Sequence, residues 1–184
     1  METPEEIVID PHEYRNCLGR FATGVTVITT EVDGQVHGMT ANGFMSVSLE
    51  PPLVLVSVGN KARLNSLLPQ SRSYGVSILS ENHEHFSRHF AGHPAEGLVI
   101  PFVKKKGVPV LESAAASLVA RVVDIHPAGD HTLYIGQVEY LEMNEARPLL
   151  FFAGKYRALD PEARHPMQAW LDDDLFFFDL DGTL

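Results

Sequence analysis

The chain has 184 residues, the usual size of one domain, and its 45% hydrophobic share can fill a core. Its formal net charge of −10 argues against nucleic acid as a partner, because only the run Lys104 to Lys106, expected to be a solvated loop, is strongly basic. The single cysteine, Cys17, cannot form an internal disulfide and is expected to pack. The sequence shows no charged-then-apolar leader and no long apolar stretch, so we expect a cytoplasmic protein that is not associated with a membrane.

The chain is expected to open with a helix. Asp10 can cap it, Pro11 suits its first position, and Glu13 completes a capping box. Either Gly19 or Gly24 ends it. Its apolar face comprises Tyr14, Leu18 and Phe21.

A β-hairpin should follow this helix. Residues 24–32 alternate between apolar and polar side chains, and Asp33-Gly34 is a hairpin turn signal before residues 35–40. The second strand of this hairpin leads into the segment 37–63, around which the rest of the chain is organised.

The segment 37–63 combines a small polar turn with two strands. Its small and amide-bearing residues let a planar ligand approach the backbone: Gly38, Thr40, Ala41, Asn42 and Gly43. Pro51-Pro52 is expected to prevent regular pairing, and residues 53–58 read as a buried strand. Lys61 and Arg63 then follow this strand in an otherwise acidic chain, so we expect them to hold a phosphate.

The remaining elements are mostly strands. We expect a short helix up to Pro69, a strand at 73–79, a helix from Ser80 to Gly92, a loop at 94–109, long strands at 115–126 and 132–143, and a last strand at 149–153. Because strands do not alternate with helices, this order favours a mainly β antiparallel barrel with a few peripheral helices.

Four segments resemble the flavin reductase family, the FMN-binding split-barrel proteins. They are GMTANGFMSVSLEPPLVLVSVGNKAR at 38–63, VSILSENHEHFSRHFAG at 76–92, GDHTLYIGQV at 129–138 and PLLFFAGKYRAL at 148–159. The resemblance spans residues 14–159. It implies a Greek-key split barrel in a domain of residues 1–160, with residues 161–184 as a C-terminal extension.

The resemblance also implies an activity. The protein would be an NAD(P)H:flavin oxidoreductase that binds FMN, or FAD, takes hydride from NADH or NADPH and feeds a separate oxygenase. It would be a homodimer with flavin near the interface. Matching positions for the flavin ring and ribityl chain are Met39, Thr40, Ala41 and Asn42, and those for the ribityl chain and phosphate are Ser57, Val58, Gly59, Asn60, Lys61, Ala62 and Arg63.

His131 resembles the family position that faces the nicotinamide. Hydride passes directly from nicotinamide to flavin, so the imidazole would act by stacking or hydrogen bonding and not as an obligatory base. The residues alone leave other interpretations open: His131 as a turn cap, Thr40 and Asn42 as turn formers, and Lys61 and Arg63 as ordinary surface cations.

The sequence departs from many family members at two positions. Ala62 and Leu64 occupy positions where many family members have a Ser-x-Thr pair, so hydroxyl contacts to the phosphate are lost. Lys61 and Arg63 would then bind the phosphate through their charge. Two other classes of protein also remain open, an FMN-binding electron carrier resembling flavoredoxin and a structural or sensory flavin module.

Two further patterns carry less chemistry. His83, His85, His89 and His93 cluster, but without the carboxylate or cysteine pattern of a metal site, so they are expected to form a solvated helix face with no metal. The ending LFFFDLDGTL resembles a haloacid dehalogenase nucleophile motif around Asp179 and Asp181. The rest of such an enzyme does not follow, and this apolar tail is expected to be covered by the barrel or by a second subunit.

Overall fold

The computed structural model describes residues 8–159, so the predicted tail at 161–184 lies outside the described part of the chain. The helices are α1 (Pro11–Leu18), α2 (Arg63–Ser71), η1 (Glu81–His83) and α3 (Glu84–Phe90). The strands are β1 (Thr23–Gly24), β2 (Thr26–Val32), β3 (Gln35–Ala41), β4 (Phe44–Leu49), β5 (Pro52–Gly59), β6 (Ser73–Ile78), β7 (Phe102–Lys105), β8 (Val108–Leu111), β9 (Ala116–Ala128), β10 (His131–Met143), β11 (Leu150–Phe152) and β12 (Lys155–Arg157).

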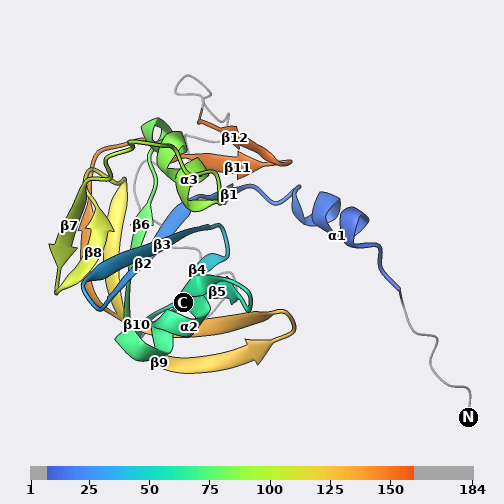
Figure 1. Cartoon of the computed structure of the whole chain (residues 1–184). Coiled ribbons are helices and arrows are strands. Elements are labelled where there is room, and N and C mark those ends of the chain that lie inside the picture. Colours follow the sequence, from blue (N-terminus) through green and yellow to red (C-terminus); the bar gives the residue numbers. More distant parts are fainter. Residues whose placement is uncertain (1–7, 160–184) are drawn as a thin grey trace, which may run out of the picture.

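One antiparallel sheet forms the body of the molecule (Figure 1). Its seven strands run in the order β3-β2-β6-β9-β10-β5-β4, so β3 and β4 are its two edges. Only Asn42 and Gly43 separate these edge strands in the chain. The sheet therefore curls into a barrel that is split between β3 and β4, and the predicted antiparallel β architecture with peripheral helices is confirmed.

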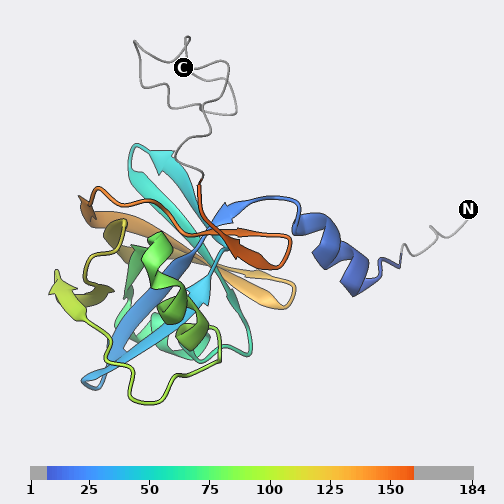
Figure 2. The ribbon, with the colours of Figure 1, turned by 90° about the horizontal axis from the view of Figure 1, so that it is seen from above.

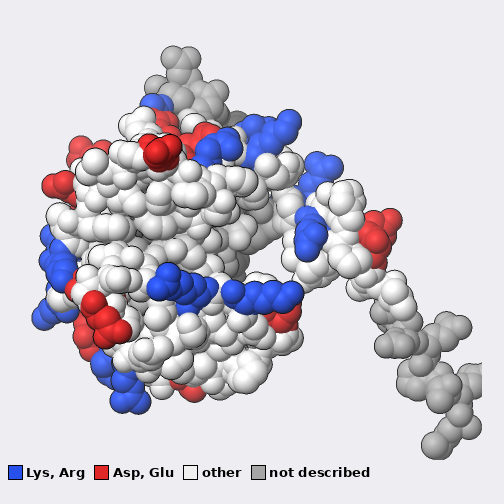
Figure 3. Space-filling view, viewed as in Figure 1, with Lys and Arg blue, Asp and Glu red and all other residues white. Residues whose placement is uncertain are grey.

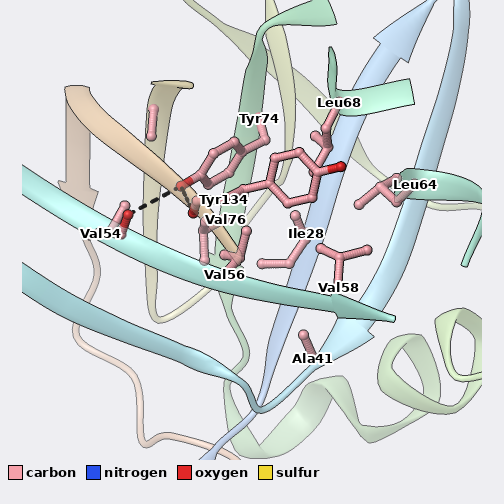
Figure 4. Packing of buried hydrophobic residues seen from close by; sticks show 11 residues of the cluster. Ile28, Ala41, Val54, Val56, Val58, Leu64, Leu68, Tyr74, Val76 and Tyr134 are labelled. Carbon is pink, nitrogen blue, oxygen red and sulfur yellow. Dashed lines mark hydrogen bonds between the residues drawn. The ribbon is translucent and has the colours of Figure 1, made fainter. Parts of the chain in front are cut away.

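Two tyrosines fill the core of this barrel (Figure 4). Tyr74 from β6 and Tyr134 from β10 are almost completely buried among aliphatic side chains. The Tyr74 hydroxyl lies 3.5 Å from the carbonyl oxygens of Val54 and Tyr134, and burial raises its pKa. A Cβ at Gly136 would collide with this hydroxyl, so the glycine makes room for the ring.

Helix α2 is joined to the barrel at a backbone carbonyl that has no hydrogen-bond partner within the helix. It continues to Ser71 past Pro69, where we expected it to end. Proline has no N–H, so the carbonyl of Asn65, four residues earlier, lacks its helical partner. The Tyr134 hydroxyl lies 2.8 Å from that carbonyl and 2.6 Å from Oδ1 of Asn65, and the hydrogen bond it donates to Asn65 joins α2 to β10.

The predicted loop at 94–109 is wrong in its second half. β7 and β8 form a hairpin there, with Lys106 and Gly107 at positive φ in the turn. Lys104 and Lys105 are strand residues that pair with Glu31 at 2.8 Å and Glu142 at 2.6 Å, so they do not form a solvated loop. The pattern was missed because Pro109 and the lysines suit a loop equally well.

Helix α1 stands away from the barrel (Figures 1 and 2). Asp10 caps it by accepting from His12 and Glu13, and Gly19 follows its last residue. None of its residues is buried: Tyr14 and Leu18 are each 54% exposed, and Phe21, which was expected on the same helix but lies beyond its end, is 77% exposed. Cys17 is exposed as well, so the expectation that it packs is wrong within the described chain.

Two smaller expectations also need correction. Pro52 pairs with Leu49, so the proline pair turns the β4–β5 hairpin and does not prevent pairing. His83 is buried and its Nδ1 lies 3.2 Å from the Ser80 hydroxyl; burial, and then the neighbouring His85, lower its pKa. The histidine cluster is therefore not a uniformly solvated face.

Among residues 8–159, no helix is long and apolar enough to span a membrane.

Candidate functional site

Three strand ends meet at one rim of the barrel. β5 pairs with β10 so that Gly59 lies opposite His131. The Ser57 amide donates to the Gly43 carbonyl at 2.8 Å, which joins the end of β5 to the turn after β3. Predicted flavin residues from both sequence segments thus lie on the same rim as the predicted nicotinamide residue.

Asn60 fastens this rim to the β9–β10 turn. Its backbone amide donates to the Asp130 carbonyl at 2.9 Å, and its side-chain amide donates to the Gly129 carbonyl at 3.3 Å. Its side-chain oxygen accepts from the Thr132 hydroxyl at 2.9 Å. Asn60 therefore positions the β9–β10 turn, and its exposed side-chain amide keeps one N–H and one acceptor site for a ligand.

The start of α2 offers donors for an anion. Lys61 and Arg63 are exposed, and Ala62, at the cap position, supplies no side-chain acceptor for the first amides of the helix. The resulting group of amides and cations suits a phosphate. The side chain of Leu64 is 2% exposed and packs in the core, so it takes no part in this group of donors.

Basic side chains stretch across the middle of the face shown in Figure 3, where α2 lies in Figure 1. The surface directly above them in this view carries no charged side chains. The face therefore combines a cationic band with an uncharged surface, as a ligand with a phosphate and an aromatic ring requires.

His131 is oriented by its neighbour Asp130. Its Nδ1 lies 2.7 Å from the Asp130 carboxylate, and the hydrogen bond from His131 is the main cause that lowers the pKa of Asp130. Nε2 faces Gly59, where an added Cβ would lie 3.8 Å away. The imidazole is thus held at the rim with Nε2 turned toward the end of β5.

The other predicted residues divide into exposed positions and structural ones. Thr40 donates its hydroxyl to the Ser87 carbonyl at 2.7 Å, and the Ala41 carbonyl accepts from Thr26 at 2.7 Å. Val58 is fully buried in the core. Met39 and Ser57 are half-buried and Asn42 is exposed, so these three keep side-chain surface at the rim.

A pocket of about 390 Å³ beside this rim was missed from the sequence. It shares Met39, Ala62 and Arg63 with the predicted site, and adds His37 and His89 among its lining. The sequence alone places His89 only within the histidine cluster. Residues 8–159 contain no group of three His, Cys, Asp or Glu side chains placed to share a metal ion.

The fold and the rim define a small antiparallel barrel protein with a cationic edge for a planar, phosphate-bearing ligand. A family model described as "Flavin reductase like domain" matches residues 18–160. An NADH-dependent flavin reductase from a Rhodococcus species is 48% identical over 155 residues, which are 83% of this chain and 88% of that protein. The chain belongs to the flavin reductase family.

Other relatives agree with this assignment. The reductase component of 4-hydroxyphenylacetate 3-monooxygenase from Thermus thermophilus is 41% identical over 79% of this chain and 95% of its own length. The structure of flavin reductase PheA2 has a TM-score of 0.81 at 50% identity, covering 83% of this chain and 99% of its own. The NADH:FAD oxidoreductase SgcE6 of Streptomyces globisporus, in complex with NAD and FAD fragments, has a TM-score of 0.78 at 34% identity over 86% and 100%.

These findings confirm the predicted split barrel and the predicted class of enzyme, a flavin reductase. The relatives' names support a reductase and not the electron carrier that the sequence left open. The residue assignments within the site remain predictions, and the geometry described above is their support.

We predict that Asn60→Ala lowers the free energy of unfolding by about 1 kcal/mol, since it removes two side-chain hydrogen bonds. Urea unfolding measures this loss, and hydrogen exchange should show faster exchange at residues 129–132. The exposed Asn82, in η1, provides the matched control Asn82→Ala. If the two substitutions have equal effects, the hydrogen bonds of the Asn60 side chain do not stabilise the β9–β10 turn.

Proposed function

We propose that this flavin reductase oxidises NADH, passes the hydride to a flavin held at the rim formed by β3, β5 and β10, and supplies reduced flavin to a separate oxygenase. One observation carries the proposal: the β5–β10 pairing sets His131 opposite Gly59, beside the cationic start of α2. The names of the Rhodococcus and Thermus relatives support NADH as donor and an oxygenase as partner.

The residues present fit a flavin. Its phosphate would be held by Lys61, Arg63 and the uncapped amides at the start of α2. Met39, Asn42 and Ser57 are the side chains that keep surface for the ring and ribityl chain. Thr40 and Asn60 contribute by holding β3 and the β9–β10 turn in place, because their side chains already have partners.

A bound flavin supplies the chemistry, because its ring accepts hydride directly from the nicotinamide. The chain's own part is to bind, to orient and to set the local field. His131 needs no proton transfer for this role. With Nδ1 hydrogen-bonded to Asp130, its Nε2 and ring face are available to position the nicotinamide over the rim.

The flavin is expected to be FMN or FAD. The printed name of one neighbour, an NADH:FAD oxidoreductase, supports FAD as an alternative to the FMN expected from the sequence. We further propose residues 1–160 as the catalytic domain with 161–184 as an extension, supported by the end of the family match at residue 160.

We also propose a cytoplasmic location. Its support is that the single cysteine, Cys17, is a free thiol, as is usual for proteins of the reducing cytoplasm.

Steady-state oxidation of NADH with excess free flavin tests the activity. We expect rapid turnover, with NADH preferred over NADPH, and release of reduced flavin that an oxygenase can use. A carrier protein would instead hold flavin tightly and show slow turnover with either nicotinamide. Such a result, obtained with FMN and FAD alike, would refute the proposal.

Changing Lys61 and Arg63 together to Ala should weaken FMN about tenfold to a hundredfold while riboflavin changes little, because riboflavin lacks the phosphate. Isothermal titration with the two flavins measures both affinities. Lys155→Ala with Arg157→Ala is the matched control, since it removes two exposed cations at the same spacing from β12. If both flavins weaken equally, the phosphate is not bound by these residues.

Replacing His131 by Ala should raise KM for NADH or slow hydride transfer, and leave flavin affinity nearly unchanged. Stopped-flow reduction of the flavin separates these effects. His126, on the same hairpin, makes a similar contact with Asp124 at 3.0 Å, so His126→Ala is the control. Reduction kinetics that match the wild type would remove His131 from the site.

We also propose a homodimer. An isolated helix of eight residues is marginal in water, and α1 leaves an apolar face open. Edge strand β4 exposes further apolar residues, Met45, Val47 and Leu49. A second copy that covers these surfaces would stabilise both and close the split beside the flavin.

Light scattering during size-exclusion chromatography should therefore give the mass of a dimer. Leu18→Glu with Phe21→Glu should shift it toward monomer, because it introduces charges on the exposed apolar surface formed by the end of α1 and the turn that follows it. Asn16→Glu changes the same helix at a polar position and serves as the control. A monomeric wild-type protein with flavin bound would contradict the proposed dimer.

A further inference from the structure

Helix α3 holds the edge strand β3 from outside the sheet (Figure 1). β3 pairs with β2 on one side and has no neighbouring strand on the other within residues 8–159. The Thr40 hydroxyl of β3 donates to the Ser87 carbonyl of α3 at 2.7 Å. Thr40 lies between Met39 and Asn42, two residues that keep side-chain surface at the rim, so the position of α3 affects where this part of the rim lies.

Ser87 also contacts a residue that lies far away in the sequence. Its hydroxyl lies 2.8 Å from the hydroxyl of Tyr156 on β12. Ser87 is completely buried, so water does not compete for this contact. The carbonyl and the hydroxyl of one serine thus connect Thr40 with Tyr156, and we call the three residues the Tyr156–Ser87–Thr40 chain.

The ring of Tyr156 is fixed by two neighbouring elements. On β11, Phe151 pairs with it in register, and the two rings meet edge to face with centroids 5.4 Å apart. On α3, the guanidinium of Arg88 lies 5.1 Å from the centre of the ring, and Glu84 holds Arg88 at 2.6 Å. The Tyr156 hydroxyl is therefore a fixed point to which Ser87 can be attached.

The hydroxyl of Tyr156 adds something that its ring does not. The ring packs against the apolar cluster that contains Phe86 and Leu149, and a phenylalanine would fill the same space. The contact of its hydroxyl with Ser87 is directional, since a hydrogen bond restricts both distance and angle. It joins the small sheet β1-β11-β12 to α3, and through Thr40 to the seven-stranded sheet.

We propose that Tyr156 is a positioning residue for the flavin. Through Ser87 and Thr40 it holds β3 in the position that receives the flavin ring. The inference rests on the proposed function, since it takes β3 as part of the flavin site. The chain ends at the part of β3 assigned to the ring and not at the phosphate, so its loss should affect FMN and riboflavin alike.

Tyr156→Phe tests this role by removing only the hydroxyl that meets Ser87. We expect the affinities for FMN and riboflavin to fall about fivefold each, the effect of losing roughly one hydrogen bond. Isothermal titration measures both. Tyr140→Phe is the matched control, because the Tyr140 hydroxyl also contacts a side chain, Glu142, and Lys105 lies 5.3 Å from its ring centre. It should leave both flavins unchanged.

A second background separates positioning from general stability. Thr40→Val breaks the last link of the chain and nearly keeps the shape of the side chain, so it should weaken both flavins by itself. In this background, Tyr156→Phe should change flavin affinity less than about twofold, although it still lowers the melting temperature by about 2–4 °C. Ser87→Ala removes the middle hydroxyl and should reproduce the effect of Tyr156→Phe, which provides a second variant if the first does not fold.

Three results would overturn the proposal. Tyr156→Phe could bind flavin as Tyr140→Phe does, it could weaken flavin equally with and without Thr40→Val, or it could weaken FMN and not riboflavin. Each is observed on variants of a wild-type protein that binds flavin and oxidises NADH. Failure of the proposed function would instead be seen in the wild-type protein itself, so the two failures are distinguishable.

Discussion

The pairing of β5 with β10 is the constraint on which the candidate site depends. It lies in the middle of the sheet, and its register alone decides that Gly59 meets His131. A shift of one residue would turn the side chains of β5 to the opposite face and expose Val56 and Val58, which are fully buried. The free energy of core packing therefore also specifies the relative position of the ligand-facing residues.

Two polar contacts extend this constraint to neighbouring segments. Asn60 joins the end of β5 to the β9–β10 turn, and Tyr134 joins β10 to α2 through Asn65. The cationic start of α2 and the imidazole of His131 are thus attached to the same two strands. A phosphate group and a nicotinamide would be positioned by one rigid framework and not by independent loops.

Local patterns in the sequence were sufficient for most elements. The Asp33-Gly34 turn, the Asp10 cap and the long strands around Gly129 follow from short-range chemistry, and each is present. The β7–β8 hairpin was harder to predict, because Pro109 and the lysines also suit a loop and Val110 and Leu111 are buried against distant parts of the chain. Within the site, the family motifs located the rim, but only the folded chain shows that the side chains of Thr40 and Asn60 already have partners.

The open edge of β3 has a consequence for solubility. An edge strand whose outward N–H and C=O groups lack partners is a template on which a strand from another chain can add. Along β3, Gly38 weakens that tendency, since it has no side chain to support a regular strand, and Phe90 of α3 packs over it.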